Sequence, residues 1–68
     1  MTRVLPCDVP AAGYCLPAVR TNYKQWGFSR DDLKRFLRDG MDATELEHID
    51  DITIKRVIEA AEKREAAQ

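Results

Sequence analysis

The chain has 68 residues, of which 34% are charged and 44% are hydrophobic, and its net charge is −1 at pH 7. A chain of this length forms at most one domain with a small core, so we take residues 1–68 as a single domain. No stretch approaches the roughly 20 apolar residues of a membrane span, and residues 1–9 lack the basic start and apolar run of a signal peptide. We expect a soluble intracellular protein that does not engage a membrane.

At the start of the chain, residues 1–7 are expected to form a tail, followed by one helical turn in residues 8–13. Asp8 is placed to cap this turn, Pro10 is tolerated in its first positions, and Gly13 is placed to end it. This turn is an addition to the main helices.

The first main helix is predicted at residues 17–26. Pro17 suits the first turn of a helix, and Val19, Tyr23 and Trp26 recur at spacings of four and three, which places them on one face. Gly27 ends the helix, because glycine adopts the left-handed conformation without a Cβ clash.

The second main helix, residues 29–39, has the clearest boundary signals. Ser29 followed three residues later by Asp32 predicts a capping box, in which the two side chains satisfy backbone N–H groups. Gly40 ends the helix. Its apolar stripe consists of Leu33, Phe36 and Leu37.

Two further helices are expected at residues 43–49 and 51–65. Asp42 is placed to cap the shorter helix, and Asp50 or Asp51 the longer one. The longer helix has the most regular amphipathic pattern, with apolar residues at i, i+3, i+4 and i+7, namely Ile54, Val57, Ile58 and Ala61. Residues 62–65 are all polar, so we expect residues 62–68 to fray.

These signals together predict an all-α fold, a compact bundle of four short helices with an extra N-terminal turn. None of the helices is long enough to be stable alone, so all of them must share one core. The predicted core consists of Val19, Tyr23, Leu33, Phe36, Leu37, Leu46, Ile54, Val57, Ile58 and Ala61.

No group of residues in the sequence has the pattern of an active site. His48 lies among acidic residues that cap helices, which is typical of a surface histidine. Cys7 and Cys15 lack metal-ligand spacing, and we expect free thiols of which one or both are buried as small apolar side chains. Since neither a phosphate-binding loop nor a nucleophile–base set is present, we predict no catalytic residues, no cofactor, no metal and no enzymatic activity.

Charge is unevenly distributed along the chain. Residues 20–38 contain six basic and two acidic residues, a net charge of +4, whereas residues 39–68 contain nine acidic and four basic residues, a net charge of −5. A basic helix beside a tight turn is compatible with a small helix-turn-helix protein that binds DNA, and we keep this as an alternative function. The pI of about 5.7 weighs against nucleic acid as the partner.

Binding to another protein is the function class that the sequence favours, because it requires no special motif. Aromatic and arginine side chains contribute most often to binding energy, and a basic face orients an acidic partner. The predicted surface comprises Tyr14, Trp26, Phe28, Arg30, Lys34, Arg35 and Arg38. A homodimer through the last helix is the main variant, since its apolar face can exceed what one small core covers.

The chain also resembles a known group of proteins. The residues that carry the resemblance are, in order, Gly13-Tyr14-Cys15, Arg20, Trp26-Gly27, Phe36, Gly40-Met41-Asp42, Leu46, Asp51 and Val57-Ile58-Glu59-Ala60. This pattern, which covers residues 9–61, is similar to that of small proteins encoded by tailed bacteriophages and prophages. The chain departs from it at Pro17, where the group tends to have glycine, and at residues 48–51, which replace a turn of small residues.

The resemblance implies a phage origin and a location in the bacterial host cytoplasm or the virion. It carries over no catalytic or binding residues. It favours a non-enzymatic role in virion structure or assembly, in the head-tail or tail region. Inhibition of a host protein, in host takeover or counter-defence, is the alternative, and nothing in the residues separates these two roles.

Overall fold

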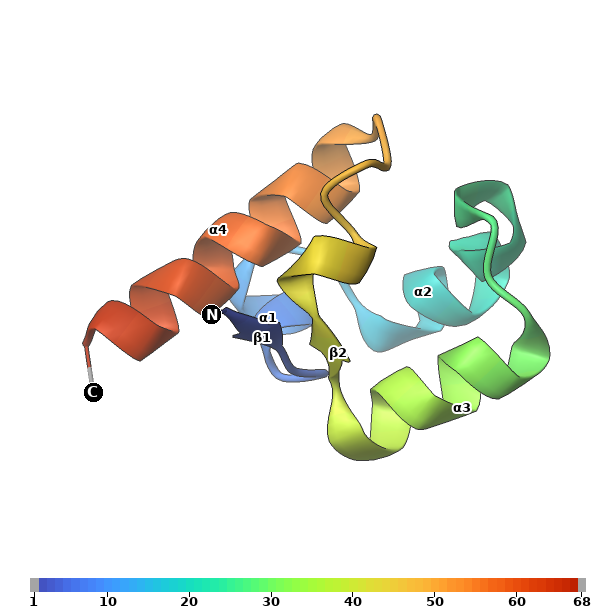
Figure 1. Cartoon of the computed structure of the whole chain (residues 1–68), viewed down its shortest axis with the longest axis horizontal. Helices are drawn as coiled ribbons and strands as arrows, with labels where there is room; N and C mark the ends of the chain where they lie inside the picture. The colour runs from blue at the N-terminus through green and yellow to red at the C-terminus, as the bar shows by residue number, and fades with distance from the viewer. Residues whose placement is uncertain (1, 68) are drawn as a thin grey trace.

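The computed structural model describes residues 2–67 and contains, within that range, four α-helices, two 3₁₀ turns and a two-stranded sheet. Figure 1 shows α4 along one side of the molecule and α2, η1 and α3 on the other. The fold is therefore mostly helical, and the sheet corrects the all-α prediction. In chain order the elements are β1 (Arg3–Val4), α1 (Asp8–Ala11), α2 (Leu16–Asn22), η1 (Tyr23–Trp26), α3 (Arg30–Asp39), β2 (Met41–Asp42), η2 (Ala43–Glu45) and α4 (Ile52–Ala66).

The sheet joins the N-terminal segment to the segment that follows α3. Its strands are antiparallel, with Arg3 opposite Asp42 and Val4 opposite Met41, and Val4 is fully buried. The prediction of a tail at residues 1–7 is therefore wrong for Arg3 and Val4, which form β1, while residue 1 lies outside the described residues. Strands of two residues are too short to show an alternation of apolar and polar positions, so this pattern cannot predict them.

Gly40 allows the two strands to approach each other. Its φ of +81° lies in the left-handed region, and a Cβ at this position would lie 2.5 Å from the Val4 carbonyl oxygen and 2.8 Å from Leu5 Cδ2. Glycine alone avoids both the strain and the clash. Gly40 therefore ends α3, as predicted, and also makes room for β1.

The predicted boundaries of α3 and α4 are confirmed by their caps. The Asp32 N–H donates to Ser29 Oγ at 3.2 Å, and the Ser29 N–H donates to Asp32 Oδ2 at 2.9 Å, which completes the capping box. At α4, the Thr53 N–H donates to Asp51 Oδ1 at 2.8 Å. These signals are local, so neighbouring residues suffice to predict them.

Two predicted helices are shorter or tighter than expected. The helix predicted at residues 17–26 is α-helical only to Asn22 and continues as the 3₁₀ turn η1, which Gly27 ends with a φ of +84°. The helix predicted at residues 43–49 is the single 3₁₀ turn η2. Asp42 does cap this turn, since it accepts a hydrogen bond from the Thr44 N–H at 3.0 Å. The helical turn nevertheless ends after three residues, at Glu45.

The N-terminal turn predicted at residues 8–13 is present as α1, and Gly13 follows it with a φ of +93°. Asp8 does not cap it. Asp8 is instead the first residue of the helix. Its buried carboxylate accepts a hydrogen bond from the N–H of Leu5, which precedes the helix, at 2.7 Å. Arg64 Nε donates a second hydrogen bond to the same carboxylate, at 2.9 Å.

This ion pair also corrects the prediction that residues 62–68 fray. The helix α4 continues to Ala66. Arg64 Nη2 donates to the Arg3 carbonyl at 2.7 Å, and Glu65 Oε2 accepts from the Arg3 N–H at 3.0 Å. Residue 68 lies outside the described residues.

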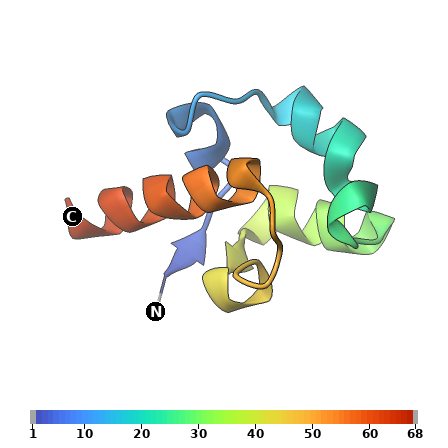
Figure 2. The ribbon, with the colours of Figure 1, turned by 90° about the horizontal axis from the view of Figure 1, so that it is seen from above.

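The core lies between α4 and the opposite side of the molecule, and α1 packs against α4, as Figure 2 shows. Of the predicted core, six residues are buried and four are half-buried, the latter being Tyr23, Leu33, Leu37 and Ile58. The buried residues that the prediction missed come from the segments read as tail, turn or helix cap, namely Val4, Val9, Met41 and Ala43. The N-terminal segment therefore contributes to the core rather than flanking it.

Removal of residues 1–5 is expected to destabilise the domain. The truncation deletes β1 and exposes the cavity left by Val4, whose burial alone contributes about 1.5–3 kcal/mol. Urea unfolding followed by circular dichroism measures the loss. Removal of residues 67–68 is the control and should leave the midpoint unchanged; equal midpoints for both truncations would contradict the role of β1.

Phe36→Ala is expected to cost about 3–5 kcal/mol, as large core truncations do, because Phe36 is only 8% exposed. A domain of this size holds little more stability than that, so the variant should be largely unfolded at 37 °C by circular dichroism. Arg30→Ala, an exposed change in the same helix, should shift stability by less than about 0.5 kcal/mol. A folded Phe36→Ala variant would show that Phe36 does not hold the core together.

Candidate protein-binding surface

A row of three positive side chains runs along the exposed face of α3. Arg30, Lys34 and Arg38 are four residues apart, so each lies about 40° further round the helix than the one before, and the row is about 12 Å long. All three are exposed. We call Arg30, Lys34 and Arg38 the cation row.

Few acidic side chains of the described residues pair with the positive charges of the cation row. Within residues 2–67, neither Arg30 nor Lys34 forms an ion pair, and Arg38 pairs only with its neighbour Asp39, at 2.8 Å between two exposed side chains. Such exposed pairs contribute little stability. The row therefore presents its charge to solvent.

Arg35, the fourth predicted basic residue, does not belong to this row. It lies about 60° beyond Arg38 round the helix and turns towards η2, where its Nη2 lies 3.0 Å from Glu45 Oε1. It also lies 3.8 Å from Asp32 Oδ1. Arg35 therefore links α3 to η2 within the fold.

The three predicted aromatic residues are half-buried rather than exposed. Tyr14, Trp26 and Phe28 all pack against the core. Trp26 and Phe28 line an apolar hollow of about 40 Å³ between the two sides of the molecule, and Tyr14 does not. The expectation of a broad exposed aromatic area is therefore corrected.

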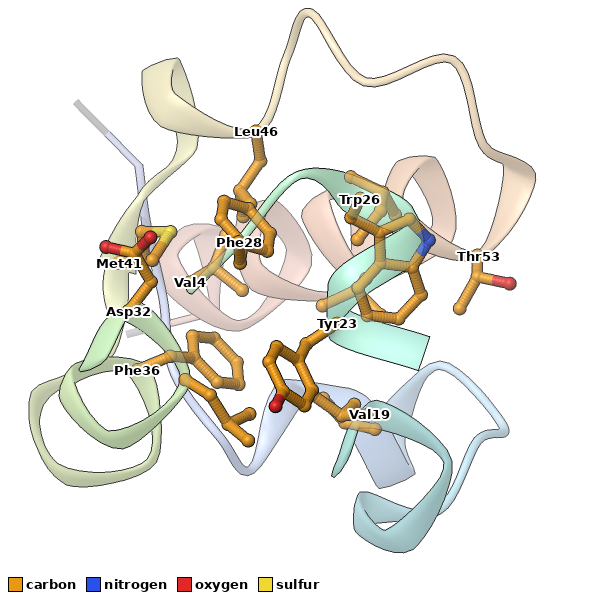
Figure 3. A pocket seen from close by; sticks show the side chains of 14 residues that line it. Val4, Val19, Tyr23, Trp26, Phe28, Asp32, Phe36, Met41, Leu46 and Thr53 are labelled. Carbon is orange, nitrogen blue, oxygen red and sulfur yellow. The ribbon is translucent and has the colours of Figure 1, made fainter. Parts of the chain in front are cut away.

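Side chains from seven elements (β1, α1, α2, η1, α3, β2 and α4) surround this hollow, which we call the aromatic hollow. Figure 3 shows the ring of Tyr23, from η1, and the ring of Phe36, from α3, pointing towards one another, with Trp26 beside Thr53 of α4. The remaining labelled walls include Val4 of β1 and Met41 of β2. The sequence pattern assigned Tyr23 and Phe36 to the core but gave no signal of a space between them.

A hydrogen bond joins the aromatic hollow to the start of α4. Trp26 Nε1 donates to Asp51 Oδ2 at 3.1 Å, while Asp51 Oδ1 caps the helix. The hydrogen bond from Trp26, followed by that from the Thr53 N–H, holds the pKa of Asp51 below its ordinary value. One carboxylate therefore fixes both η1 and the first turn of α4.

The cysteines are free and exposed, so the expectation that one or both are buried is wrong. Cys7 directly precedes α1, and Cys15 directly precedes α2. His48 is exposed as well. Among residues 2–67, no cluster of three or more histidine, cysteine or acidic side chains has the geometry to hold a metal ion.

The apolar face of α4, which motivated a homodimer, is used inside the fold. Ile54, Val57 and Ala61 are buried and Ile58 is half-buried. Among the described residues, Ile52 is the exposed large hydrophobic side chain, with 62% of its surface accessible. No helix in residues 2–67 combines the length and apolar character needed to cross a bilayer.

Comparisons with protein families, curated proteins and solved structures find no match for this chain.

Acid is expected to weaken the bond between Trp26 and Asp51. Because the pKa of folded Asp51 lies below its ordinary value of 3.8, the ionised carboxylate stabilises the fold above that value. This contribution is lost as the pH falls through the lowered pKa. Asp51→Asn, which keeps a capping side chain without the charge, should show a smaller fall in melting temperature over the same pH range.

The fluorescence of Trp26, the single tryptophan of the chain, reports the same change at the site itself. In the wild type its emission should shift as the pH falls below 3.8 and before global unfolding. Parallel curves for the wild type and Asp51→Asn, in both measurements, would contradict the coupling.

Proposed function

We propose that this chain is a non-enzymatic protein-binding module that docks onto an acidic surface of another protein through the cation row of α3. The observation that carries the proposal is the row itself, since Arg30 and Lys34 form no ion pair within residues 2–67.

Arg30 and Lys34 reduce the stability of α3, whereas Arg38 lies in the last turn, where a positive charge favours the helix dipole. Like charges four residues apart destabilise a helix by about 0.2–0.5 kcal/mol per pair, and Arg30–Lys34 and Lys34–Arg38 are two such pairs. Arg30 is also the first residue of α3, where a positive charge opposes the helix dipole. Features that conflict with local stability are expected mainly at functional sites.

An acidic protein surface suits the row better than nucleic acid does. The chain has a net charge of −1 and so lacks the strongly basic composition that is typical of DNA-binding domains. Proteins that bind duplex DNA through phosphates typically neutralise about 6–10 of them, and the row offers three cations. A row of this length instead matches carboxylates spaced one turn apart on a partner helix.

The biological setting of the proposal comes from the resemblance to small phage proteins. It supports a role in virion structure or assembly, in the head-tail or tail region, with inhibition of a host protein as the alternative. In both roles a small body acts by covering a surface, and an interface of about 800 Å² per partner is within its reach.

Charge reversal of the row tests the proposal. Wild-type chain, immobilised and exposed to extracts of infected or lysogenic bacteria, should capture a stoichiometric partner. Arg30→Glu with Lys34→Glu should abolish this capture, and added salt should weaken it, because screening shortens the reach of exposed charges. Arg56→Glu with Lys63→Glu, an equal change of charge on the exposed face of α4, is the matched control and should retain capture.

Different outcomes separate the candidate roles. Loss of capture in the control as well would show a general charge effect and overturn the role of the row. A sequence-selective shift of duplex DNA that the row variant abolishes would favour the helix-turn-helix alternative. Recovery of the chain in purified virions favours assembly, whereas a stoichiometric host target that is absent from virions favours inhibition.

A further inference from the structure

The aromatic hollow has the properties of a pocket for one apolar group. It measures about 40 Å³, is partly open to the surface, and its walls expose only apolar atoms. A cavity of this kind gives a water molecule no hydrogen-bonding partner, and apolar cavities stay dry and accept apolar guests.

Size and chemistry restrict what can enter the hollow. Pockets for metabolites and cofactors measure about 300–1,000 Å³ and contain a few placed polar groups, and the aromatic hollow has neither. Two polar side chains at its edge are already engaged. The Asp32 carboxylate accepts hydrogen bonds from the Ser29 N–H at 2.9 Å and from Ser29 Oγ at 3.0 Å, and Trp26 Nε1 donates to Asp51 Oδ2 at 3.1 Å. One aliphatic side chain is the guest that fits.

Positive charge lies beside the walls of the hollow. Lys24 Nζ lies 6.0 Å from the centre of the Tyr23 ring, and Tyr23 lines the hollow. Arg30 precedes Leu33, another lining residue, by one helical turn. Neither Lys24 nor Arg30 forms an ion pair within residues 2–67, so both are available to carboxylates that flank the guest.

We infer that the aromatic hollow receives a single aliphatic side chain of the protein partner, from a segment that places acidic residues beside it on Lys24 and Arg30. This inference rests on the proposed function and names the element that the partner presents. Binding energy at protein interfaces concentrates in such buried anchors, while flanking charges set orientation and association rate.

A library of random dodecapeptides displayed on particles tests the inference. Selection on the wild-type chain should enrich peptides with one Leu, Ile or Met flanked by Asp or Glu. Val19→Leu adds a methylene group to a wall of the hollow, and it should weaken the selected peptides about tenfold or more, because one methylene in an apolar pocket discriminates by about 10–200-fold.

Two further variants make the test specific. Val57→Ile fills the hollow from α4 instead of α2 and should have the same effect, with thermal unfolding confirming that both filled variants are folded. Thr21→Leu is the matched control, because it adds apolar bulk to an exposed position of α2 outside the hollow, and it should bind the peptides as the wild type does.

Each outcome decides between the two proposals. Enriched peptides that bind the filled variants as tightly as the wild type, or a selection that enriches nothing, overturn the inference. Acidic peptides without an aliphatic anchor, lost with Arg30→Glu and Lys34→Glu but not with Val19→Leu, would support the cation row and refute the pocket. Loss with Lys24→Glu together with loss on filling supports the inference, and loss with Arg30→Glu and Lys34→Glu as well supports both proposals.

Discussion

The buried carboxylate of Asp8 holds together parts of the chain that no local signal connects. It accepts hydrogen bonds from the Leu5 N–H and from the guanidinium of Arg64, and Arg64 Nη2 also donates to the Arg3 carbonyl. A buried charge is stable only when it is paired and hydrogen-bonded, and Asp8 is 1% exposed. The contacts of Asp8 and Arg64 therefore fix the positions of β1, α1 and the end of α4 relative to one another. The position of β1 in turn sets that of β2, and with it the direction in which the chain leaves α3.

The parts of this fold that follow from the sequence are those decided by near neighbours. Ser29 and Asp32 form their capping box three residues apart, Gly27 and Gly40 end helical segments, and the pattern in α4 identifies its buried face. The strands were missed because two residues have no period, and Asp8 was misread as a cap because its partner is 56 residues away. The expected burial of the cysteines is wrong because general burial statistics do not distinguish positions directly before a helix, where Cys7 and Cys15 lie.

The candidate surface likewise has features that local sequence predicts and features that depend on contacts between distant residues. That α3 bears a positive exposed face was readable from its helical period, and the structure places Arg30, Lys34 and Arg38 on it together. The separation of Arg35 was not readable, because it depends on where η2 brings Glu45. From the sequence, the aromatic residues are predicted to lie on the surface, but whether they face solvent or a hollow depends on how η1 and α4 meet, and the hydrogen bond between Trp26 and Asp51 joins these two elements.

Two features of this domain run against its own stability, and both involve α3. One is the row of like charges on the outside of the helix, and the other is the unfilled apolar space beneath Leu33 and Phe36. A small domain has little stability to spare, and filling a cavity is among the commonest ways in which a protein gains stability. Arg30 and Leu33 lie one turn apart, so a single partner segment can neutralise the row and occupy the hollow at once. Under the proposed function, the free chain is the less complete of two states, and binding would supply contacts that its own 68 residues leave unmade.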